Sequence, residues 1–370
     1  MSNKNLPVII SMGFVSEKDD LTAILMDTGL RKKDLRRFTI GEKRLLTSCL
    51  KALKKGRLEN NSDTKGGIIV GSNWGNIGSV MSEEEEALYE NDFENISPFI
   101  LLKSLSSTPT NRCSIILGLN SVSITFGGGD NSGIQAVVEA ARLLKTLSNI
   151  DFILAGTFEV ITESRLKLLE HLNTNPLKSL LFRSRLFSRL LLKKEKVFRY
   201  LWKFQAQNPV PLGGSGTILV EKADHASARG ADILAIIKDH RQVTFSNKAD
   251  SSLAEREIAA LLNNGNPSHA GNDTGMNAGV DAVISLHHLD KRNRKLEKKI
   301  LKKIGFNGGF FPVDEIVGNN FSVSDMGAIA FGTSLFQFTN TRRILINSFG
   351  QCSYSGLVLE KYETGHNYNG

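Results

Sequence analysis

The chain has 370 residues, too many for one ordinary hydrophobic core and enough for two domains or one large α/β body. Hydrophobic residues make up 41% of it, which excludes a disordered chain, and no apolar run reaches the roughly 18 residues of a membrane-spanning helix. The formal net charge of +8 favours an acidic partner, and does not choose among nucleic acid, an anionic membrane and an acidic protein.

Short apolar runs alternate with amphipathic stretches, which is the pattern of an α/β protein. The apolar start, residues 6–15, has no small-residue cleavage site, so it is expected to be a buried first strand rather than a signal peptide. Strands are predicted at 8–11, 67–71, 152–156, 216–221, 344–348 and 356–360. Helices are predicted at 134–147, at 252–265 with a capping box of Ser252 and Glu255, and at 290–305, which is very basic.

The chain divides at a basic stretch, residues 165–207, in which Lys and Arg are interleaved with Leu and Phe. We predict a first half of residues 1–164, this insertion or cap segment, and a second half of residues 208–370. The strand–helix pattern on each side is compatible with an ancient duplication, although no short repeat is visible.

Three cysteines, Cys49, Cys113 and Cys352, have a spacing that fits neither a metal site nor a disulfide framework. We expect each to be a small core residue, which suits a reducing, cytoplasmic setting. No metal or cofactor is predicted.

Six segments, in order along nearly the whole chain, resemble the β-ketoacyl-acyl carrier protein synthases, or ketosynthases. They are PVIISMGFVS (7–16), GGIIVGSNWGNIG (66–78), SPFILLKSLSSTPTNRCSIILGL (97–119), NIDFILAGTFE (149–159), LGGSGTILVEKADHASARGADILA (212–235) and INSFGQCSYSGLVLE (346–360). Each alone is weak, but six in the family's order make chance a poor explanation. The resemblance implies a thiolase-like five-layer αβαβα fold of two similar halves, and a dimer formed through the central strands.

Ketosynthases condense acyl groups with a cysteine thiolate at a helix N-terminus and two histidines that assist decarboxylation and stabilise the enolate. The family spacing holds without a gap from Gly118 to Gly133, and the nucleophile position falls on Asp130. A carboxylate is a poor acyl carrier, because its mixed anhydride hydrolyses readily. We expect Asp130 to cap the helix that follows, with a role in decarboxylation or in binding a polar group as the alternative.

The two histidine positions are also changed in this resemblance. The family's His-Gly-Thr-Gly-Thr motif is best matched by residues 272–276, which puts Asn272 at the first histidine. The turn that follows the second histidine is matched by residues 324–332, which puts Ser324 there. His269 lies outside the motif and is expected to be structural, while His287 and His288 are too distant in sequence to be assigned.

Two details of the loops belong to the same comparison. Gly127, Gly128 and Gly129 are expected to keep the turn before the nucleophile position; a phosphate loop is not expected, because no Lys-Ser/Thr follows them. Residues 351–353 differ from the family's Phe-Gly-Gly, which puts the usual acyl-pocket gate in doubt.

A ketosynthase-like subunit without the Cys-His-His triad resembles the chain-length factor of type II polyketide synthases. The resemblance implies a non-catalytic subunit that pairs with an active ketosynthase and limits polyketide length by the depth of a shared tunnel. Leu101, Leu105 and Thr108, at helical spacing in a helix from residue 97 to about 112, are candidates for the tunnel floor, and ordinary dimer core is the equal alternative.

The implied second partner is a phosphopantetheinylated acyl carrier protein. Arg183, Arg185 and Arg189 in the basic stretch are candidates for docking it; contact with an anionic membrane and a plainly solvated helix are the alternatives. A decarboxylase or acyltransferase with a rearranged active site stays open, as does a partner subunit of an aryl-polyene or fatty-acid-type ketosynthase. No nucleic-acid-binding motif supports a nucleic-acid partner.

Overall fold

The strands of the chain repeat a single order twice. The computed structural model describes residues 5–15, 19–58, 65–80, 98–160, 213–245, 251–262, 279–287, 291–315, 322–350 and 353–363. The first half holds β1 (Pro7–Val15), β2 (Gly66–Gly71), β3 (Val122–Phe126), β4 (Phe152–Glu159) and β5 (Gly214–Lys222). The second holds β6 (Ala235–Thr244), β7 (Ala282–Leu286), β8 (Gly309–Pro312), β9 (Arg343–Phe349) and β10 (Ser353–Glu360).

The sheet order is β3-β2-β4-β5-β1 in the first half and β8-β7-β9-β10-β6 in the second. In both halves the second strand of the order lies parallel to its two neighbours, and the remaining pairs are antiparallel. Each strand of one half therefore has a counterpart five strands later. This repeat supports an ancient duplication, with which the sequence pattern is also compatible.

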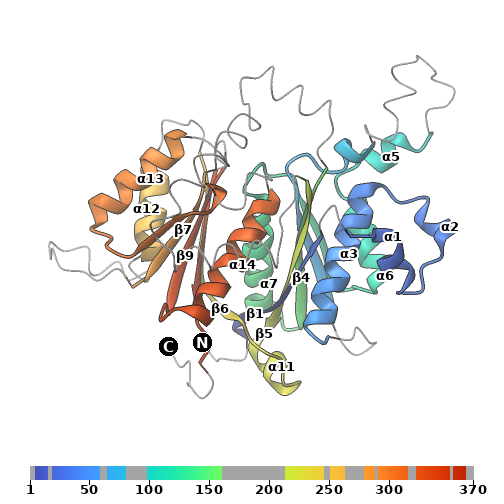
Figure 1. Ribbon diagram of the computed structural model, residues 1–370, viewed down its shortest axis with the longest axis horizontal. Coiled ribbons are helices and arrows are strands. Elements are labelled where there is room, and N and C mark those ends of the chain that lie inside the picture. The colour runs from blue at the N-terminus through green and yellow to red at the C-terminus, as the bar shows by residue number, and fades with distance from the viewer. Residues whose placement is uncertain are drawn as a thin grey trace, which may run out of the picture.

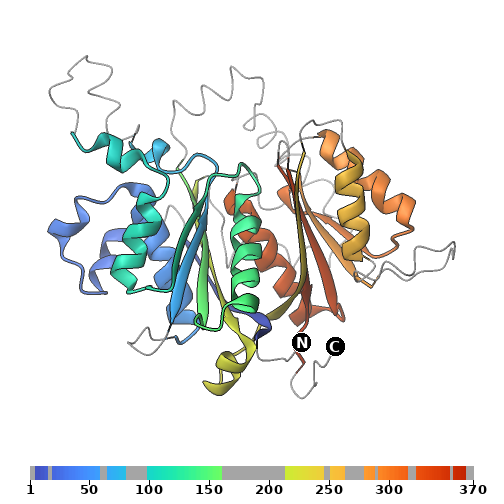
Figure 2. The ribbon, with the colours of Figure 1, turned by 180° about the vertical axis from the view of Figure 1, so that it is seen from behind.

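The halves are joined by β1 and β6, which pair only at Val8↔Ile236 and Ile9↔Ala235. Beyond this narrow joint the sheet separates into two leaves, and Figure 1 and Figure 2 show them on either side of α7 (Ser132–Thr146) and α14 (Ser322–Phe338). Both central helices are buried on most of their surface, as expected for helices covered by sheets on two sides.

Helices also cover the two outer faces. α3 (Ile40–Lys55) and α6 (Thr108–Leu117) lie against the first leaf, and α12 (Ser251–Leu262) and α13 (Lys291–Ile304) against the second (Figure 1). The shorter helices are α1 (Leu21–Met26), α2 (Lys32–Leu35), α5 (Ile100–Ser104) and α11 (Ala223–Ala228). Counted across the molecule, the layers run αβαβα, so the predicted fold is confirmed.

The apolar core follows the layers. One cluster fills the middle layer and includes Ile134 and Met326, a second lies beneath α3 and includes Leu45, and a third lies beneath α12 and α13 and includes Ile300. Cys49 and Cys113 are buried in the second cluster with free thiols, as predicted for core residues. Cys352 lies outside the described residues.

All six predicted strands are strands, and the helices predicted at 134–147 and 290–305 are α7 and α13. Three predictions are wrong in detail. The single helix from residue 97 to about 112 is broken between α5 and α6, because Leu105 takes an extended conformation with ψ 130°. Residues 324–332, matched to a turn, lie inside α14, and α12 begins at Ser251, which puts Ser252 inside the helix rather than at its N-cap.

The proposed boundaries at residues 164 and 207 fall outside the described residues and stay a prediction. Within the described ranges, no helix combines the length and the apolar character needed to cross a bilayer.

Candidate functional site

Polar side chains gather where the parallel strands end and the two central helices begin. β2, β3 and β4 are parallel in the first half, and β7, β8 and β9 in the second, so in each half their carboxyl ends lie at one edge. Hydrogen bonds from the first turn of α14 reach the ends of both β4 and β9, which brings the two edges together. In α/β sheets this edge is where ligands bind.

Asp130 lies at this edge, directly before α7. Its Oδ1 accepts a hydrogen bond of 2.6 Å from Nδ2 of Asn73, which follows β2. The side chain is half-buried. Gly129, immediately before it, has a φ of +87°, so the predicted glycine turn is present at that residue.

The expectation that Asp130 caps α7 is not met as stated, because the N-cap position is Asn131. The carboxylate that accepts a backbone N–H from the first turn comes from α14: Asp325 Oδ2 accepts from Ile134 N at 3.1 Å. Asp325 Oδ1 accepts from Ser348 Oγ on β9 at 2.7 Å, and the side chain is fully buried. A negative charge at the positive end of a helix stabilises it, so Asp325 does the work expected of Asp130.

Asn131 ties α7 to the hairpin of β9 and β10. The side chain is fully buried. Its Oδ1 accepts from Ser353 Oγ at 3.0 Å and from Gln135 Nε2 at 3.2 Å, and its Nδ2 donates to Ser355 Oγ at 3.1 Å. Asn131, directly after Asp130, is therefore held in place by the second half of the molecule.

Glu159, at the end of β4, is a further fully buried carboxylate of the edge. Its Oε1 accepts from the backbone N of Asn73 at 2.6 Å and from Ser322 Oγ at 2.8 Å. Asn73 thus receives a fixed position from Glu159 and donates its amide to Asp130. Ser324, matched to the second histidine, is fully buried in the first turn of α14 and carries no titratable group.

His287 follows β7 and is the described histidine of this edge, with a side chain only 1% exposed. Its Nε2 lies 2.6 Å from Glu297 Oε2, and its Nδ1 lies 3.9 Å from Asp314 Oδ1. Burial would lower the pKa of His287, but the Asp314 and Glu297 carboxylates together raise it to about 9. The ring is stacked on Phe349 at the end of β9, with centroids 5.7 Å apart.

Glu297 is itself fully buried and has neutral donors besides His287. Ser285 Oγ and Asn347 Nδ2 each donate to its Oε1 at 2.6 Å, and Tyr354 OH donates to Asn347 Oδ1 at 2.7 Å. The imidazole therefore belongs to a buried charged network that joins β7, α13, β9 and β10. Because so little of the ring is exposed, this geometry suits a structural ion pair rather than a group that takes a proton from substrate.

The sequence reasoning did not single out Asn73, Glu159 or Asp325, and it left His287 unassigned. All but Asp325 end or directly follow a buried strand, and the rule that parallel strands present their functional residues at their carboxyl ends could have found them. Asn272 and His269 lie outside the described residues, as do His288 and the docking candidates Arg183, Arg185 and Arg189.

The tunnel candidates lie on an exposed apolar surface around α5 and α6. Leu101 is 72% exposed and Leu105 49%, while Thr108 is half-buried and donates to Leu102 O at 2.7 Å. Because the helix breaks at Leu105, the three side chains do not share one helical face. Phe99 and Leu102 of this segment, Ile77 after β2 and Ile115 of α6 are also exposed apolar residues.

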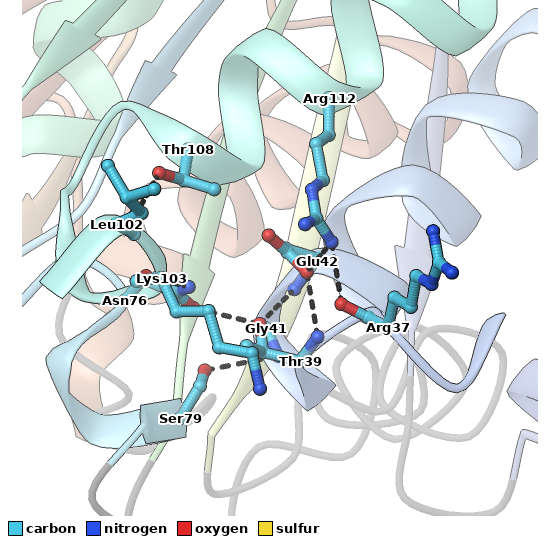
Figure 3. Close-up of polar contacts among 10 residues, drawn as sticks. All are labelled: Arg37, Thr39, Gly41, Glu42, Asn76, Ser79, Leu102, Lys103, Thr108 and Arg112. Atoms are coloured by element: carbon cyan, nitrogen blue, oxygen red, sulfur yellow. Dashed lines mark hydrogen bonds and ion pairs between the residues drawn. The ribbon is translucent and has the colours of Figure 1, made fainter. Parts of the chain in front are cut away.

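A polar network fixes this surface to α3 (Figure 3). Arg112 of α6 donates to Glu42 Oε2 at 3.0 Å and to Arg37 O at 2.7 Å. Asn76 donates to Lys103 O of α5 at 2.6 Å and accepts from Thr39 Oγ1 at 3.0 Å. The apolar surface is consequently presented on an ordered support.

Among the described residues, no group of three or more His, Cys, Asp or Glu side chains is placed to hold a metal ion.

Comparison with known proteins gives the same fold and one matching family model. Residues 13–172 match the family model described as "Beta-ketoacyl synthase, N-terminal domain". A curated relative, the 3-oxoacyl-[acyl-carrier-protein] synthase 2 of Vibrio cholerae, is 24% identical over 208 residues, which is 56% of this chain and 47% of the relative. The match thus spans about half the length of that relative.

Three solved structures are similar over nearly the whole chain. A type II PKS acyl-carrier protein in complex with its ketosynthase bound to the hexaketide (AntDE:AntF) has a TM-score of 0.70 at 18% identity, covering 96% of this chain and 99% of that one. The ishigamide ketosynthase/chain length factor has 0.69 at 14%, covering 97% and 99%. A β-ketoacyl synthase from Burkholderia phymatum has 0.69 at 14%, covering 97% and 100%.

At these identities the solved structures establish the fold alone, whereas the family model reaches the segment that contains Asp130. Residues 13–172 are therefore similar to the N-terminal domain of β-ketoacyl synthases, and nearly the whole chain has the fold of the solved ketosynthase structures.

Proposed function

We propose that this chain is a non-condensing, ketosynthase-like subunit that pairs with an active ketosynthase and sets product length, as a chain-length factor does. The observation that carries the proposal is Asp130. It lies directly before α7, at the position that the sequence resemblance assigns to the family's nucleophile, and its carboxylate accepts a hydrogen bond from Asn73 at 2.6 Å.

The chemistry of condensation explains why this residue matters. An acyl chain must be held as a thioester, and the attacking group must be a thiolate that can also leave. A carboxylate can form only a mixed anhydride, which water cleaves before a condensation is complete. A subunit with Asp130 at this position needs a thiol supplied by a partner.

The surface around α5 and α6 supports pairing. Leu101 and Ile115 are 72% and 80% exposed, and clustered apolar side chains on a surface indicate an interaction site. β3 lies at the edge of the sheet beside α6 and pairs, among described strands, only with β2, so it can receive a strand from a second subunit. In this proposal Leu101, Leu105 and Thr108 line the end of a shared tunnel.

An acyl carrier protein delivers the substrate in the same proposal, and Arg183, Arg185 and Arg189 stay the candidates for docking it. Cys49 and Cys113 are free thiols, which suits the cytoplasm as the place of assembly.

The deciding experiment is co-expression with an active ketosynthase and its carrier protein, followed by sizing and product analysis. We expect a stable heterodimer that makes a longer or more defined polyketide than the ketosynthase alone, and no condensation by this chain alone. A homodimer that never exchanges subunits would contradict the proposal. So would carbon dioxide release from malonyl-carrier protein by the single chain that disappears in Asp130→Ala, because that result favours a decarboxylase.

Tunnel depth is tested by Leu105→Ala. Removing about three heavy carbons deepens an apolar tunnel by a length comparable to one added two-carbon unit. We expect a shift toward longer products with the heterodimer intact. Ile115→Ala, on the same surface but on α6, is the matched control and should leave product length unchanged. An unchanged profile in Leu105→Ala would assign this residue to ordinary interface packing.

A further inference from the structure

The outer face of α13 is a ridge of positive charge. The helix contains eight Lys or Arg residues and one acidic residue, Glu297, which is buried and held by His287. Its apolar side chains pack inward, with Ile300 and Leu301 in the outer core of the second half. What faces solvent along the helix is therefore almost purely cationic.

Three of these cations form a straight stripe. Lys295, Lys299 and Lys302 are exposed, and no hydrogen bond or ion pair joins them to any described residue. Their spacing of four and then three residues keeps them on one face, with steps of about 6 and about 4.5 Å along the axis. By contrast, Lys303 forms an ion pair with Glu255 of α12, and Lys298 lies over the ring of Phe310.

Such a helix is electrostatically disfavoured in isolation. Like charges four residues apart repel, and there is no acidic residue in the first turn to match the helix dipole. An anionic partner laid along the stripe would remove the repulsion without disturbing the buried face. The arrangement therefore suits a surface that binds an anionic partner.

The stripe fits an acidic helix better than the other polyanions. On a partner helix, carboxylates spaced three and four residues apart recur at the same interval as these lysines. A membrane-binding helix would turn apolar side chains outward, but here they are buried. Surfaces that bind single-stranded nucleic acid interleave aromatic side chains for stacking, and the exposed positions of α13 are Lys and Arg.

We propose that α13 is a docking surface for an acidic α-helix of a partner protein. α13 covers the outer face of the second half, whereas α5 and α6 lie on the first, so this docking leaves the pairing surface free (Figure 1 and Figure 2). The inference goes beyond the proposed pairing and does not depend on it.

The test is binding of a labelled, alanine-based helical peptide of about 20 residues with Glu at every third or fourth position, measured by fluorescence anisotropy. The full-length chain should bind it, more weakly as salt rises from about 50 to about 300 mM. Lys295→Glu/Lys299→Glu/Lys302→Glu should weaken binding by about tenfold or more. The corresponding glutamine variant should give a smaller loss, and serves if the reversal impairs folding.

The matched control is Lys32→Glu/Lys33→Glu/Arg36→Glu, which makes the same charge change at exposed positions around α2. It should change affinity by less than about twofold. An equal loss in both variants would assign the binding to net charge and overturn the proposal. Equal or tighter binding of a proline-containing Glu peptide of the same charge, of duplex DNA, or of phosphatidylserine vesicles would also overturn it, because the occupant would not be a helix.

Discussion

His287 shows how burial and pairing compete at a single residue. Burial disfavours its charged form, but the carboxylates of Asp314 and Glu297 act in the opposite direction and raise the pKa to about 9. The imidazole is therefore protonated in the folded protein at neutral pH, while in the unfolded chain it has a pKa near 6.5.

This difference predicts a pH dependence of stability. Because the folded pKa is raised, the favourable contribution is complete below about pH 6.5 and is lost as the pH rises through about 9. It amounts to roughly 3 kcal/mol at its maximum. We expect the free energy of unfolding of wild type to exceed that of His287→Gln most at about pH 6, and the gap to narrow by pH 10, measured by urea unfolding across pH.

His225 is a useful comparison in the same experiment. Its ring contacts Glu221, whose carboxylate raises the pKa of His225, but the imidazole is partly open to solvent. The difference in unfolding free energy between wild type and His225→Gln should change less with pH than the difference between wild type and His287→Gln. A constant gap between wild type and His287→Gln across the range would show that the imidazole does not titrate in the folded protein.

At this scale the sequence located the position of Asp130 but not its surroundings. An ungapped sequence match depends only on neighbouring residues, so it could place Asp130 directly before a helix. The contacts of Asp130 with Asn73, of Ile134 with Asp325 and of His287 with Asp314 join residues distant in sequence, and no spacing rule contains them. Polar residues at strand ends were visible, yet which of them meet depends on the sheet order.

The contact of α7 with α14 depends on Gly133. A Cβ there would lie 2.4 Å from Ser322 O and 2.8 Å from Asp325 Cβ. The two helices approach so closely because this position has no side chain.

Gly133→Ala should therefore push the two helices apart and cost roughly 1–3 kcal/mol of unfolding free energy, measured by chemical denaturation. Gly127→Ala is the control in the same glycine-rich region, since a Cβ at Gly127 meets nothing within 4 Å and its φ is not positive. Equal midpoints for wild type and Gly133→Ala would show that the helices can separate at little cost.

α6 is held to α3 by Arg112, which pairs with the fully buried Glu42 and lies 5.0 Å from the Phe38 ring centroid (Figure 3). Arg112→Met keeps the length of the side chain but removes its charge and donors. We expect a loss of roughly 2–4 kcal/mol, because a buried carboxylate loses its cation.

The matched control is Arg31→Met, which breaks an exposed pair with Asp34 and should leave the denaturation midpoint where it is. If both variants unfold at the wild-type midpoint, solvent must replace Arg112 as the partner of Glu42.

Six of the ten described strands and the helices α7, α12 and α13 were predicted, because a buried strand and an amphipathic helix each have their own apolar period, whereas β3, β6, β7, β8 and α3 were not predicted. The break at Leu105 was missed although Pro109 indicated it: proline favours the first turn of a helix and so announces a new start near Thr108. α14 was missed because a helix covered on all sides has no polar face and hence no helical period.

At the scale of the molecule, the exposed apolar surface should control assembly. Leu101→Glu/Ile115→Glu places two charges where pairing would bury them, and we expect loss of the heterodimer in size-exclusion chromatography with light scattering. Met26→Glu, at an exposed apolar residue on α1, is the control and should pair normally. Persistence of the complex in the double variant would move the interface elsewhere.

The repeated strand order has a consequence for how many subunits can join. Among the described strands, β3 and β8 form the two edges of the sheet, and they are not alike. β3 has five residues, every one with a backbone donor, whereas β8 has four and ends in Pro312, which has none. A strand can add to the first edge but finds a poor template at the second. In the proposed pairing through β3, this difference between the edges disfavours further growth of the sheet into a fibre.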